Sequence, residues 1–238
     1  MSFYSLFAPY YEQVFPFRNQ VYSFLRTYSG RPGDAMLDAE CGTGHYCGMF
    51  LRDGFRVTGI DLDPMMIDAA SATYPQGSFH CMDMAGIGSL QSSFQLIYSI
   101  GNVLAYLPHE EVEQFLRAVH AALETGGYWV FQVVNWDYLL TLKEYSFPVK
   151  SIAGGSLTFH RRYSLISPEQ VIFDVKLISS QGITVFNEHS KIYPYSTEIY
   201  LRLHEAAGFT LEGIYSGFDK SLFVKESDSA LVLVFTKR

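Results

Sequence analysis

The feature that most constrains the fold is the alternation of short apolar segments with helical segments between residues 35 and 135. Each apolar segment has the length and continuous hydrophobicity of a strand that is buried on both faces, and each ends in polar or acidic residues. The expected strands are 35–37, 56–60, 78–82, 94–100 and 128–134. Because helical segments separate them, four to five such units predict a parallel, doubly wound α/β sheet.

The pattern changes after residue 135. Three segments alternate apolar and polar residues, as strands of a half-exposed antiparallel sheet do, and short turns join them into two hairpins. These segments are 157–166, 171–179 and 183–193. A helix over 197–207 and two strands, 210–216 and 230–236, follow. We therefore expect a helical lid at 1–30, a main domain made of 31–136 and 196–238, and a small antiparallel cap at 137–195.

Composition narrows the classes of partner and compartment. The chain has 238 residues, enough for one sizeable α/β domain, and 17 basic against 24 acidic residues give a net charge of −7. This balance, without a block of Lys or Arg, argues against a nucleic acid or an anionic membrane as partner. Three cysteines without a CxxC pair, no signal-peptide pattern and no apolar run of about 20 residues predict a soluble, cytoplasmic protein. Cys41, His45 and Cys47 lack the second ligand pair of a zinc site, so no metal is expected.

A glycine-rich turn at residues 40–44 joins the first expected strand to its helix, and such a turn lets a ligand approach the backbone closely. Asp61 ends the second strand, where it can accept hydrogen bonds from both hydroxyls of a ribose. Asp83 ends the third strand, where it can hold an adenine amino group. A dinucleotide enzyme would need a third glycine, as in GxGxxG, to fit a pyrophosphate, and this turn has none at that place. The residues therefore favour adenosylmethionine over a dinucleotide.

Five motifs resemble those of the class I, Rossmann-like methyltransferases that use S-adenosylmethionine, closest to the small-molecule branch that methylates glycine and amino sugars. They are Leu37–Gly44 (LDxGCGTG in the family), Val57–Met66, Met82–Met84, Phe94–Ser99 (FDLI in the family) and Leu123–Gly127 (LxPGG in the family). The likeness is close over 35–135. It implies a seven-stranded, mostly parallel sheet with an antiparallel last strand and a small antiparallel β cap inserted after the fifth strand. It also implies S-adenosyl-L-methionine as cofactor and S-adenosyl-L-homocysteine as product.

The resemblance also implies the residues that bind this cofactor. Asp61 would bind the ribose hydroxyls, and Leu62 and Met66 would pack on adenine. Asp83 with Met84 would hold the edge of adenine, while the turn glycines would lie under the methionine portion. The full set of candidates is Tyr10, Arg18, Asp38, Glu40, Cys41, Gly42, Gly44, Asp61, Leu62, Met66, Asp83, Met84, Ser99 and Gly101.

Two residues depart from the family pattern. Gln95 replaces an aspartate, but that position faces away from the ligand in the usual arrangement. Glu40 stands where the family has glycine, and its carboxylate either reaches the ammonium group of the ligand or blocks close approach. If it blocks, the alternative function is a catalytically silent sensor or partner protein that binds adenosylmethionine or adenosylhomocysteine.

The N-terminal aromatic residues resemble the lid of small-molecule methyltransferases; they are Tyr4, Phe7, Tyr10, Tyr11 and Phe15. Tyr11 stands where the family often has an aspartate. A tyrosine hydroxyl near the sulfonium, which we assign to Tyr10, would orient the methyl group, and Arg18 would bind the methionine carboxylate. The alternative is that these aromatic residues only pack the helix.

On the acceptor side, residues 99–106 resemble the GNSLxYL segment of glycine and amino-sugar N-methyltransferases, which faces the transferred methyl group. His109, His160 or His189 would accept a proton from an amine, although each is more often simply a strand or loop histidine. Arg161 and Arg162 alternate on a strand, so only one faces the cleft, where it would suit a carboxylate or phosphate.

The predicted function is methyl transfer to the nitrogen or oxygen of a small metabolite, with a homodimer as one possible assembly. Methylation of RNA or protein is disfavoured by the net charge and by the lack of an NPPY-type tetrapeptide. The catalytic candidates are Tyr10, Asn102 and His189, and the substrate-binding candidates are Asn102, Tyr106, His160, Arg161 and Tyr193.

Overall fold

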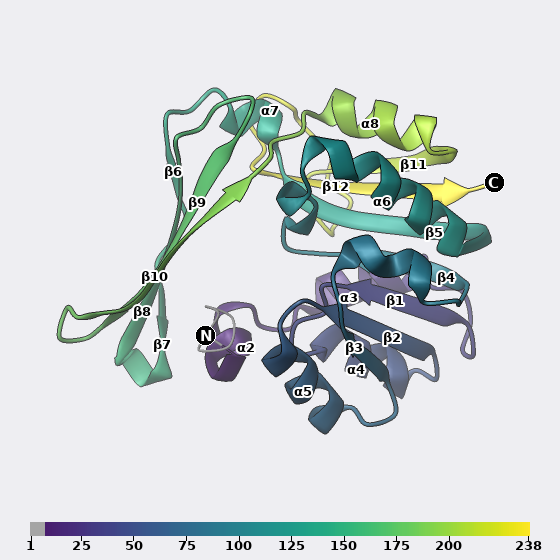
Figure 1. Ribbon diagram of the computed structural model, residues 1–238, viewed down its shortest axis with the longest axis horizontal. Helices are drawn as coiled ribbons and strands as arrows, with labels where there is room; N and C mark the ends of the chain where they lie inside the picture. Colours follow the sequence, from purple (N-terminus) through teal and green to yellow (C-terminus); the bar gives the residue numbers. More distant parts are fainter. Residues whose placement is uncertain (1–7) are drawn as a thin grey trace.

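The structure, a computed structural model, describes residues 8–238 and contains two β-sheets (Figure 1). Tyr4 and Phe7, which we expected in the lid, lie outside the described residues. The main sheet has seven strands in the order β11-β12-β5-β4-β1-β2-β3. Its strands are β1 (Ala35–Ala39), β2 (Arg56–Asp61), β3 (Ser78–Cys81), β4 (Phe94–Ser99), β5 (Leu123–Val134), β11 (Phe209–Tyr215) and β12 (Ala230–Lys237).

The strand directions confirm the predicted fold class. Strands β5, β4, β1, β2 and β3 pair in parallel, whereas β12 runs antiparallel to both β5 and β11. The apolar runs of β1 and β4 correspond to strands buried on both faces, with all five residues of β1 buried, whereas the edge strand β3 is mostly exposed.

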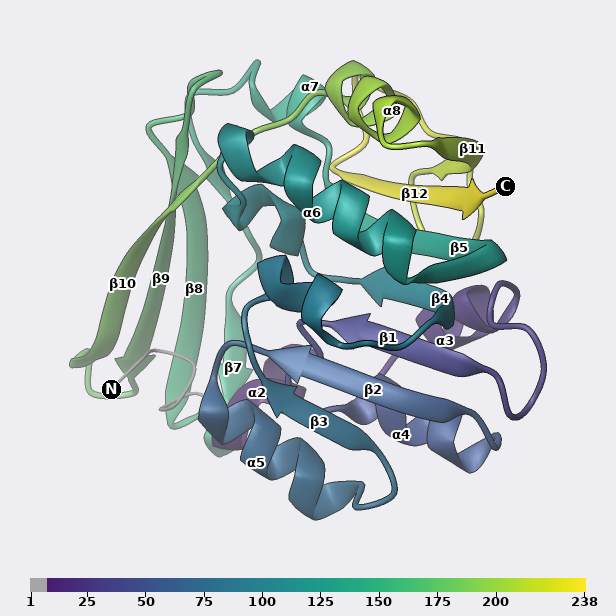
Figure 2. The same cartoon turned by 45° about the vertical axis from the view of Figure 1, so that its right-hand side comes forward.

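Helices cover both faces of this sheet (Figure 2). On one face, α3 (Asn19–Arg26) and α4 (His45–Arg52) pack on Met36, Leu96 and Val130. On the other face, α6 (His109–Ala122) and α8 (Thr197–Ala206) pack on Leu37 and Ile97, which directly follow Met36 and Leu96 in their strands. This alternation follows from the two-residue period of a strand. The remaining helix of the domain, α5 (Pro64–Thr73), contacts β2 and β3.

Several elements differ from the expectation. The glycine turn at 125–127 lies inside β5, because the pairing between β4 and β5 shifts between Phe94 and Leu96 and Gly126 adopts a φ of 80°. Short elements were not predicted, since one helical turn or a two-residue strand carries no readable period. They are η1 (Ala8–Tyr10), α2 (Tyr11–Val14), η2 (Met84–Ser89), η3 (Val103–Tyr106), α7 (Trp136–Leu139), β6 (Tyr145–Ser146), β7 (Lys150–Ile152) and η4 (Ala153–Gly155).

The second sheet is antiparallel and lies opposite the carboxyl ends of the parallel strands of the main sheet; the arrowheads of β1, β2 and β4 point toward it in Figure 2. Its long strands β8 (Leu157–Ser164), β9 (Val171–Ser179) and β10 (Thr184–Ile192) form the two predicted hairpins, and β6 and β7 both pair with β8. Its inner face packs against α2 and α7 through Phe159, Tyr163 and Val175. Among residues 8–238, no helix is long and apolar enough to cross a membrane.

Candidate functional site

The glycine-rich turn after β1 is built from left-handed residues. Glu40, Gly42 and Gly44 have φ values of 72°, 55° and 78°. The backbone amides of Glu40 and Cys41 both donate to the carbonyl of Ile60, each at 2.8 Å, which fixes the turn to the end of β2. A residue other than glycine is strained in the left-handed region, so the φ of Glu40 explains why related turns carry glycine at this position.

Asp61, the last residue of β2, is hydrogen-bonded to the backbone of the glycine-rich turn. Its Oδ2 accepts a hydrogen bond from the backbone amide of Gly42 at 2.8 Å, and its Oδ1 accepts one from Asp63 at 2.9 Å. Burial raises the pKa of Asp61, and these two amides oppose that rise. The carboxylate is therefore oriented by backbone donors while each oxygen keeps a further lone pair for a ligand.

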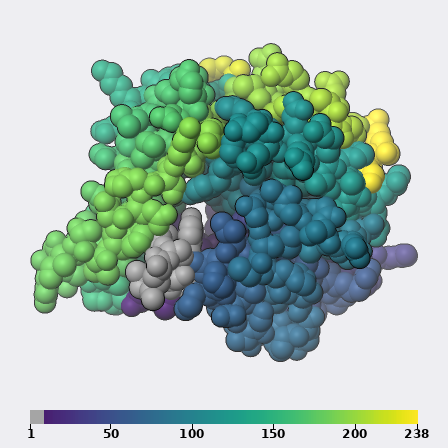
Figure 3. All heavy atoms as spheres, in the orientation of Figure 1, coloured from purple at the N-terminus to yellow at the C-terminus, as the bar shows by residue number. Residues whose placement is uncertain are grey.

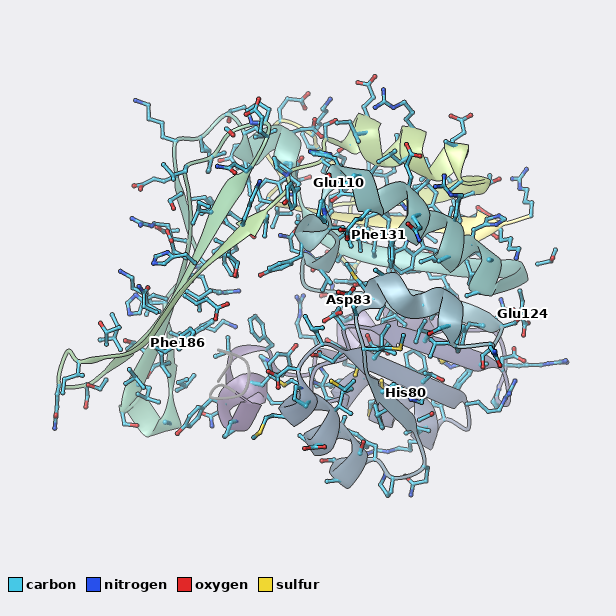
Figure 4. The ribbon with its side chains drawn as sticks, in the orientation of Figure 1. His80, Asp83, Glu110, Glu124, Phe131 and Phe186 are labelled. Atoms are coloured by element: carbon cyan, nitrogen blue, oxygen red, sulfur yellow. The ribbon has the colours of Figure 1, made fainter. Side chains whose placement is uncertain are left out.

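Three carboxyl groups meet at this edge of the sheet. The pKa of Glu40 lies well above its usual range, first because the group is buried and then because Asp61 and Asp83 repel its charge. A hydrogen bond with the backbone of Leu62 partly opposes this, so the Glu40 side chain is directed toward the end of β2. Asp83 caps η2 by accepting from the amide of Ala85 at 2.8 Å, and Figure 4 shows it at the edge of the domain that faces the second sheet.

No Lys, Arg or His between residues 8 and 238 forms an ion pair with Glu40, Asp61 or Asp83. The three carboxyl groups therefore have no counter-ion among the described residues, and their mutual repulsion contributes to the raised pKa of Glu40. Such a site favours a ligand with cationic groups or hydrogen-bond donors, and it disfavours a polyanion.

Asp38 and Cys41 do not face this edge with their side chains, which corrects our expectation. Asp38 is 4% exposed, and its Oδ2 accepts from the thiol of Cys47 at 3.5 Å. Burial raises the pKa of Asp38 to about 7. Cys41 is also buried and belongs to the core cluster beneath the turn. Both residues shape the turn from inside the core.

The residues expected around adenine divide by exposure. Leu62 is 63% exposed at the end of β2 and can cover a ring. Met66 is 1% exposed, so its side chain belongs to the core and cannot provide such a surface. The helical position that faces solvent is that of Met65, which is half exposed. The prediction that Met66 packs on adenine is therefore wrong, while the placement of Met84 at the edge of adenine beside Asp83 stays a prediction.

At the end of β4, Ser99 is buried and its hydroxyl has no hydrogen-bond partner among the described residues. Gly101 follows with its amide donating to Gln132 Oε1 at 3.0 Å. The side chain of Asn102 is used structurally: its Oδ1 accepts from the amide of Val134 at 3.0 Å and its Nδ2 donates to the hydroxyl of Tyr163 at 3.2 Å. Asn102 thus ties the main sheet to the cap, which corrects its placement as a catalytic and substrate-binding residue.

The short helix α2 covers the glycine turn. A Cβ added to Gly42 would lie 2.8 Å from Cζ of Tyr11, so the tyrosine ring rests directly on this glycine. The hydroxyl of Thr43 donates to Glu12 at 2.9 Å. Tyr10 and Tyr11 both pack against the apolar cluster of the cap. The tyrosine that the described contacts place on the turn is Tyr11, and the role assigned to Tyr10 stays a prediction.

The same helix is also bonded to the cap. The ammonium group of Lys150 donates to the carbonyl of Val14, and the amide of Ala153 donates to Oε1 of Gln13 at 2.8 Å. Arg18 follows α2, is exposed and donates to Gln20 at 3.2 Å. The described contacts do not bring its guanidinium to the turn.

His45, the first residue of α4, is a site residue that the sequence suggested only as a metal ligand, a role that was not expected. Its Nδ1 is buried without a hydrogen-bond partner among residues 8–238, and its ring centre lies 6.4 Å from that of Tyr11. Burial lowers the pKa of His45, which favours the neutral ring. Its place immediately after Gly44, at the start of a helix, was the available signal.

The cap residues separate by face. The register pairs His189 with Asp174 and His160 with Lys176, on the face opposite the buried Phe159. His189 is 55% exposed and its Nδ1 contacts Asp174. Both histidines therefore point away from the cleft, because neighbouring strand residues alternate faces. Their assignment to catalysis and substrate binding is corrected.

Arg161, Tyr106 and Tyr193 remain on the side of the main sheet. Arg161 lies on the inner face of β8, whereas Arg162 pairs with Asp174 on the outer face. Tyr106 ends η3 and is half buried. The amide of Tyr193 donates to the carbonyl of Ala105 at 2.6 Å, which fastens the end of the cap to η3.

The surface is hollowed between the green strands of the cap and the blue part of the main domain in Figure 3. The ends of β1 and β4 point toward the second sheet in Figure 2. Among the described residues, no group of three His, Cys, Asp or Glu side chains could hold a metal ion.

Comparison with known proteins gives a family match over part of the chain. Residues 36–127 match the family model described as a methyltransferase domain. A malonyl-[acyl-carrier protein] O-methyltransferase from Serratia marcescens is 50% identical over 42 residues, which are 18% of this chain and 16% of that protein. The chain spans 16% and 57% of the length of the two curated relatives that it matches.

Solved structures match the fold over nearly the whole chain. An S-adenosylmethionine-dependent methyltransferase from Clostridium acetobutylicum has a TM-score of 0.80 and 16% identity, with 99% of each chain covered. The sugar N-methyltransferase KedS8 from Streptoalloteichus has a TM-score of 0.71 and 21% identity, with 100% of this chain and 93% of that chain covered. The resemblance seen in the motifs is thereby confirmed, in sequence over 36–127 and in fold over both sheets.

Proposed function

We propose that this chain, which carries a methyltransferase domain and has the fold of S-adenosylmethionine-dependent methyltransferases, transfers a methyl group from S-adenosylmethionine to the nitrogen or oxygen of a small metabolite. The observation that carries the proposal is the carboxylate of Asp61. Two backbone amides orient it at the end of β2, beside a left-handed turn and an exposed apolar side chain. This is the arrangement that a ribose flanked by an adenine requires.

The described residues fit this cofactor. Asp61 would hold the ribose hydroxyls, Leu62 would cover adenine, and Asp83 would accept from its amino group. The amino end of α4, with the unpartnered Nδ1 of His45, would face the methionine carboxylate beside Gly42. When bound, the cofactor supplies a methyl group activated by a positively charged sulfonium.

Charge supports adenosylmethionine over a nucleotide with phosphates. Adenosylmethionine brings a sulfonium and an ammonium group, both cationic, to an edge where Glu40, Asp61 and Asp83 lack counter-ions of their own. A pyrophosphate at the same edge would meet three carboxyl groups. Since repulsion between like charges strengthens in a partly buried site, these residues select against a dinucleotide.

Methyl transfer requires orientation and exclusion of water more than a strong base. Tyr11 covers the turn, and the cap lies over the carboxyl ends of the strands, so the elements for closing the site are in place. The loop from Ser99 to Tyr106, at the end of β4, borders the hollow where an acceptor would enter. We assign the acceptor side to 137–195, the cofactor side to 31–136 and 196–238, and the lid to α2, because α3, which lies within the predicted lid at 1–30, packs on the main sheet.

The likeness to KedS8, named as a sugar N-methyltransferase, supports a small-molecule acceptor. The net charge of −7 is in keeping with such an acceptor rather than a nucleic acid. We also propose a cytoplasmic location, from the three cysteines without disulfide pairing. Assembly as a homodimer stays a prediction, to be checked by light scattering.

Calorimetric titration with S-adenosylmethionine and S-adenosylhomocysteine tests the cofactor. Asp61→Ala is expected to weaken binding roughly 10- to 100-fold, because hydrogen bonds to a charged group each contribute about 1.5–3 kcal/mol. Asp68→Ala, an exposed position on α5, is the matched control and should bind as the wild type does. Absence of binding to both compounds would end the proposal.

Turnover separates the enzyme from the silent sensor. Release of adenosylhomocysteine is measured across a panel of amines, alcohols and acids. Product with any acceptor supports the enzyme, whereas tight cofactor binding with no product from the whole panel supports the sensor.

A further inference from the structure

Arg161 is a cation enclosed by aromatic rings on the inner face of the cap. Its neighbours on the same face of β8, Phe159 and Tyr163, are 1% and 3% exposed. The guanidinium carbon lies 4.6 Å from the ring centre of Phe147, 5.3 Å from that of Phe15 and 5.6 Å from that of Phe159. The Arg161 side chain therefore lies between the cap and Phe15, which directly follows α2.

This cation has no anionic partner in the described protein. Its Nε is buried without a hydrogen-bond partner, and no carboxylate among residues 8–238 forms an ion pair with it. Burial lowers the pKa of Arg161, and the groups that oppose this are the hydroxyls of Tyr163 and Tyr145. Aromatic faces offset part of the desolvation of an arginine, but a partly buried charge without a counter-ion still destabilises a fold. An anion from outside the chain would supply the missing counter-ion.

A second cation shares the same aromatic ring. Lys150 lies on the inner face of β7, with its Nζ 5.8 Å from the ring centre of Phe15. Its pKa is lowered by burial and by the charge of Arg161. The acid on this face of the cap is Glu188, but the register places Val175 between it and Arg161. Two strand spacings, roughly 9–10 Å, separate their backbones, and no ion pair joins them.

The position of Arg161 relative to the end of β4 determines where an anionic group bound by Arg161 would lie. Tyr163, two residues further along β8, accepts a hydrogen bond from Asn102, which directly follows Gly101. Two residues of a strand span roughly 7 Å, so Arg161 lies about that far from this junction along the inner face. A group bound by Arg161 would thus be held apart from the methyl donor while the rest of the compound reaches the end of β4.

We infer that the methyl acceptor carries an anionic group, a carboxylate or a phosphate, which pairs with Arg161 and is assisted by Lys150. This rests on the proposed function, because it names the class of compound that the methyltransferase accepts. An arginine suits this task since its planar guanidinium binds either group through two parallel hydrogen bonds, and Lys150 adds a point charge.

The test uses acetate and inorganic phosphate as probes of the protein loaded with adenosylhomocysteine. Calorimetry compares the wild type, Arg161→Gln and Lys176→Gln, the last being an exposed lysine on the outer face of β9. Loss of the arginine is expected to weaken binding of the recognised anion about 10- to 100-fold, and the control is expected to leave it unchanged. Whether acetate or phosphate responds distinguishes the two sources of charge.

Thermal unfolding provides a second measurement. Removing an unpaired buried charge should leave the midpoint of Arg161→Gln unchanged or raise it. A lower midpoint, or failure to fold, would mean that the arginine holds the structure together, and would overturn the inference. Equal anion binding by the wild type and Arg161→Gln, in protein that binds adenosylhomocysteine, overturns it too and leaves the proposed function standing. Failure to bind adenosylhomocysteine at all instead contradicts the proposed function.

Discussion

Replacing Asp38 with asparagine removes a carboxyl group that lies in the core under the glycine turn. The side chain is 4% exposed, and it accepts a hydrogen bond from the thiol of Cys47 at 3.5 Å. Asparagine has nearly the same shape and keeps an oxygen acceptor for that thiol. The substitution therefore changes the ionisation of the site with little change in its packing.

The size of the effect follows from the pKa of Asp38. Burial raises it from 3.8 to about 7, so the folded protein holds the proton more tightly than the unfolded chain does. The associated stability is fully present below about pH 4 and is lost as the pH rises toward 7. Each pH unit in that window corresponds to about 1.4 kcal/mol, which gives a total of about 4 kcal/mol. Asp38→Asn lacks this loss.

Urea denaturation of the wild type and Asp38→Asn at pH 5, 6, 7 and 8 measures the difference. The variant should gain about 3 kcal/mol of unfolding free energy relative to the wild type between pH 5 and pH 8. Asp68→Asn, an exposed residue of α5, should show a constant difference over the same range. Parallel pH curves for the wild type and Asp38→Asn would refute the argument. Adenosylhomocysteine affinity should not change, because the side chain faces the core.

Substitutions at four further positions test other parts of the site. Gly42→Ala places a Cβ 2.8 Å from the ring of Tyr11 and should weaken adenosylhomocysteine binding about 10-fold in calorimetry; a Gly42→Ala/Tyr11→Ala variant that recovers nothing would contradict this. Met66→Ala should lower the unfolding free energy by about 2–4 kcal/mol without weakening the binding of adenosylhomocysteine. Leu62→Ala should weaken the binding of adenosylhomocysteine without lowering the unfolding free energy. Equal effects of the two substitutions on stability and binding would show that the placement of Met66 in the core and Leu62 at the site is wrong. Glu40→Gly should relieve about 1 kcal/mol of backbone strain at φ 72°, and its gain in urea denaturation should be larger at pH 8 than at pH 5 because burial raises the Glu40 pKa; a gain that shrinks with pH would contradict the cause given.

The fold was largely predictable from the sequence because its signals are local. Continuous apolar runs mark the strands, and the acids at or just after their ends, Asp61 in β2 and Asp83 two residues beyond β3, mark one edge of the sheet. Strand-end residues in parallel neighbours meet whatever the details of packing. For the same reason the alternation in 157–193 was enough to predict the antiparallel cap.

The residues that the sequence misplaced depend on docking between elements. Adjacent positions such as Met65 and Met66 differ by about 100° around a helix, and only the seating of α5 decides which is buried. Alternation puts Arg161 and His160 on opposite faces of β8, but which face is inner depends on where α2 packs. Asn102 matched a family motif, yet its amide is used by Val134 and Tyr163, which lie 32 and 61 residues away in the chain.

Helix α2 has only four residues, and it is bonded on both of its sides. Glu12 and Tyr11 meet the glycine turn, while Gln13 and the carbonyl of Val14 meet the cap. Helix α2 lines both the cofactor side and the acceptor side. A ligand that moves α2 on one side therefore changes the free energy with which a ligand binds on the other side. Linkage then requires reciprocity: the factor by which adenosylhomocysteine changes acceptor affinity equals the factor by which the acceptor changes adenosylhomocysteine affinity. Binding of the cofactor and binding of the acceptor therefore share one coupling free energy.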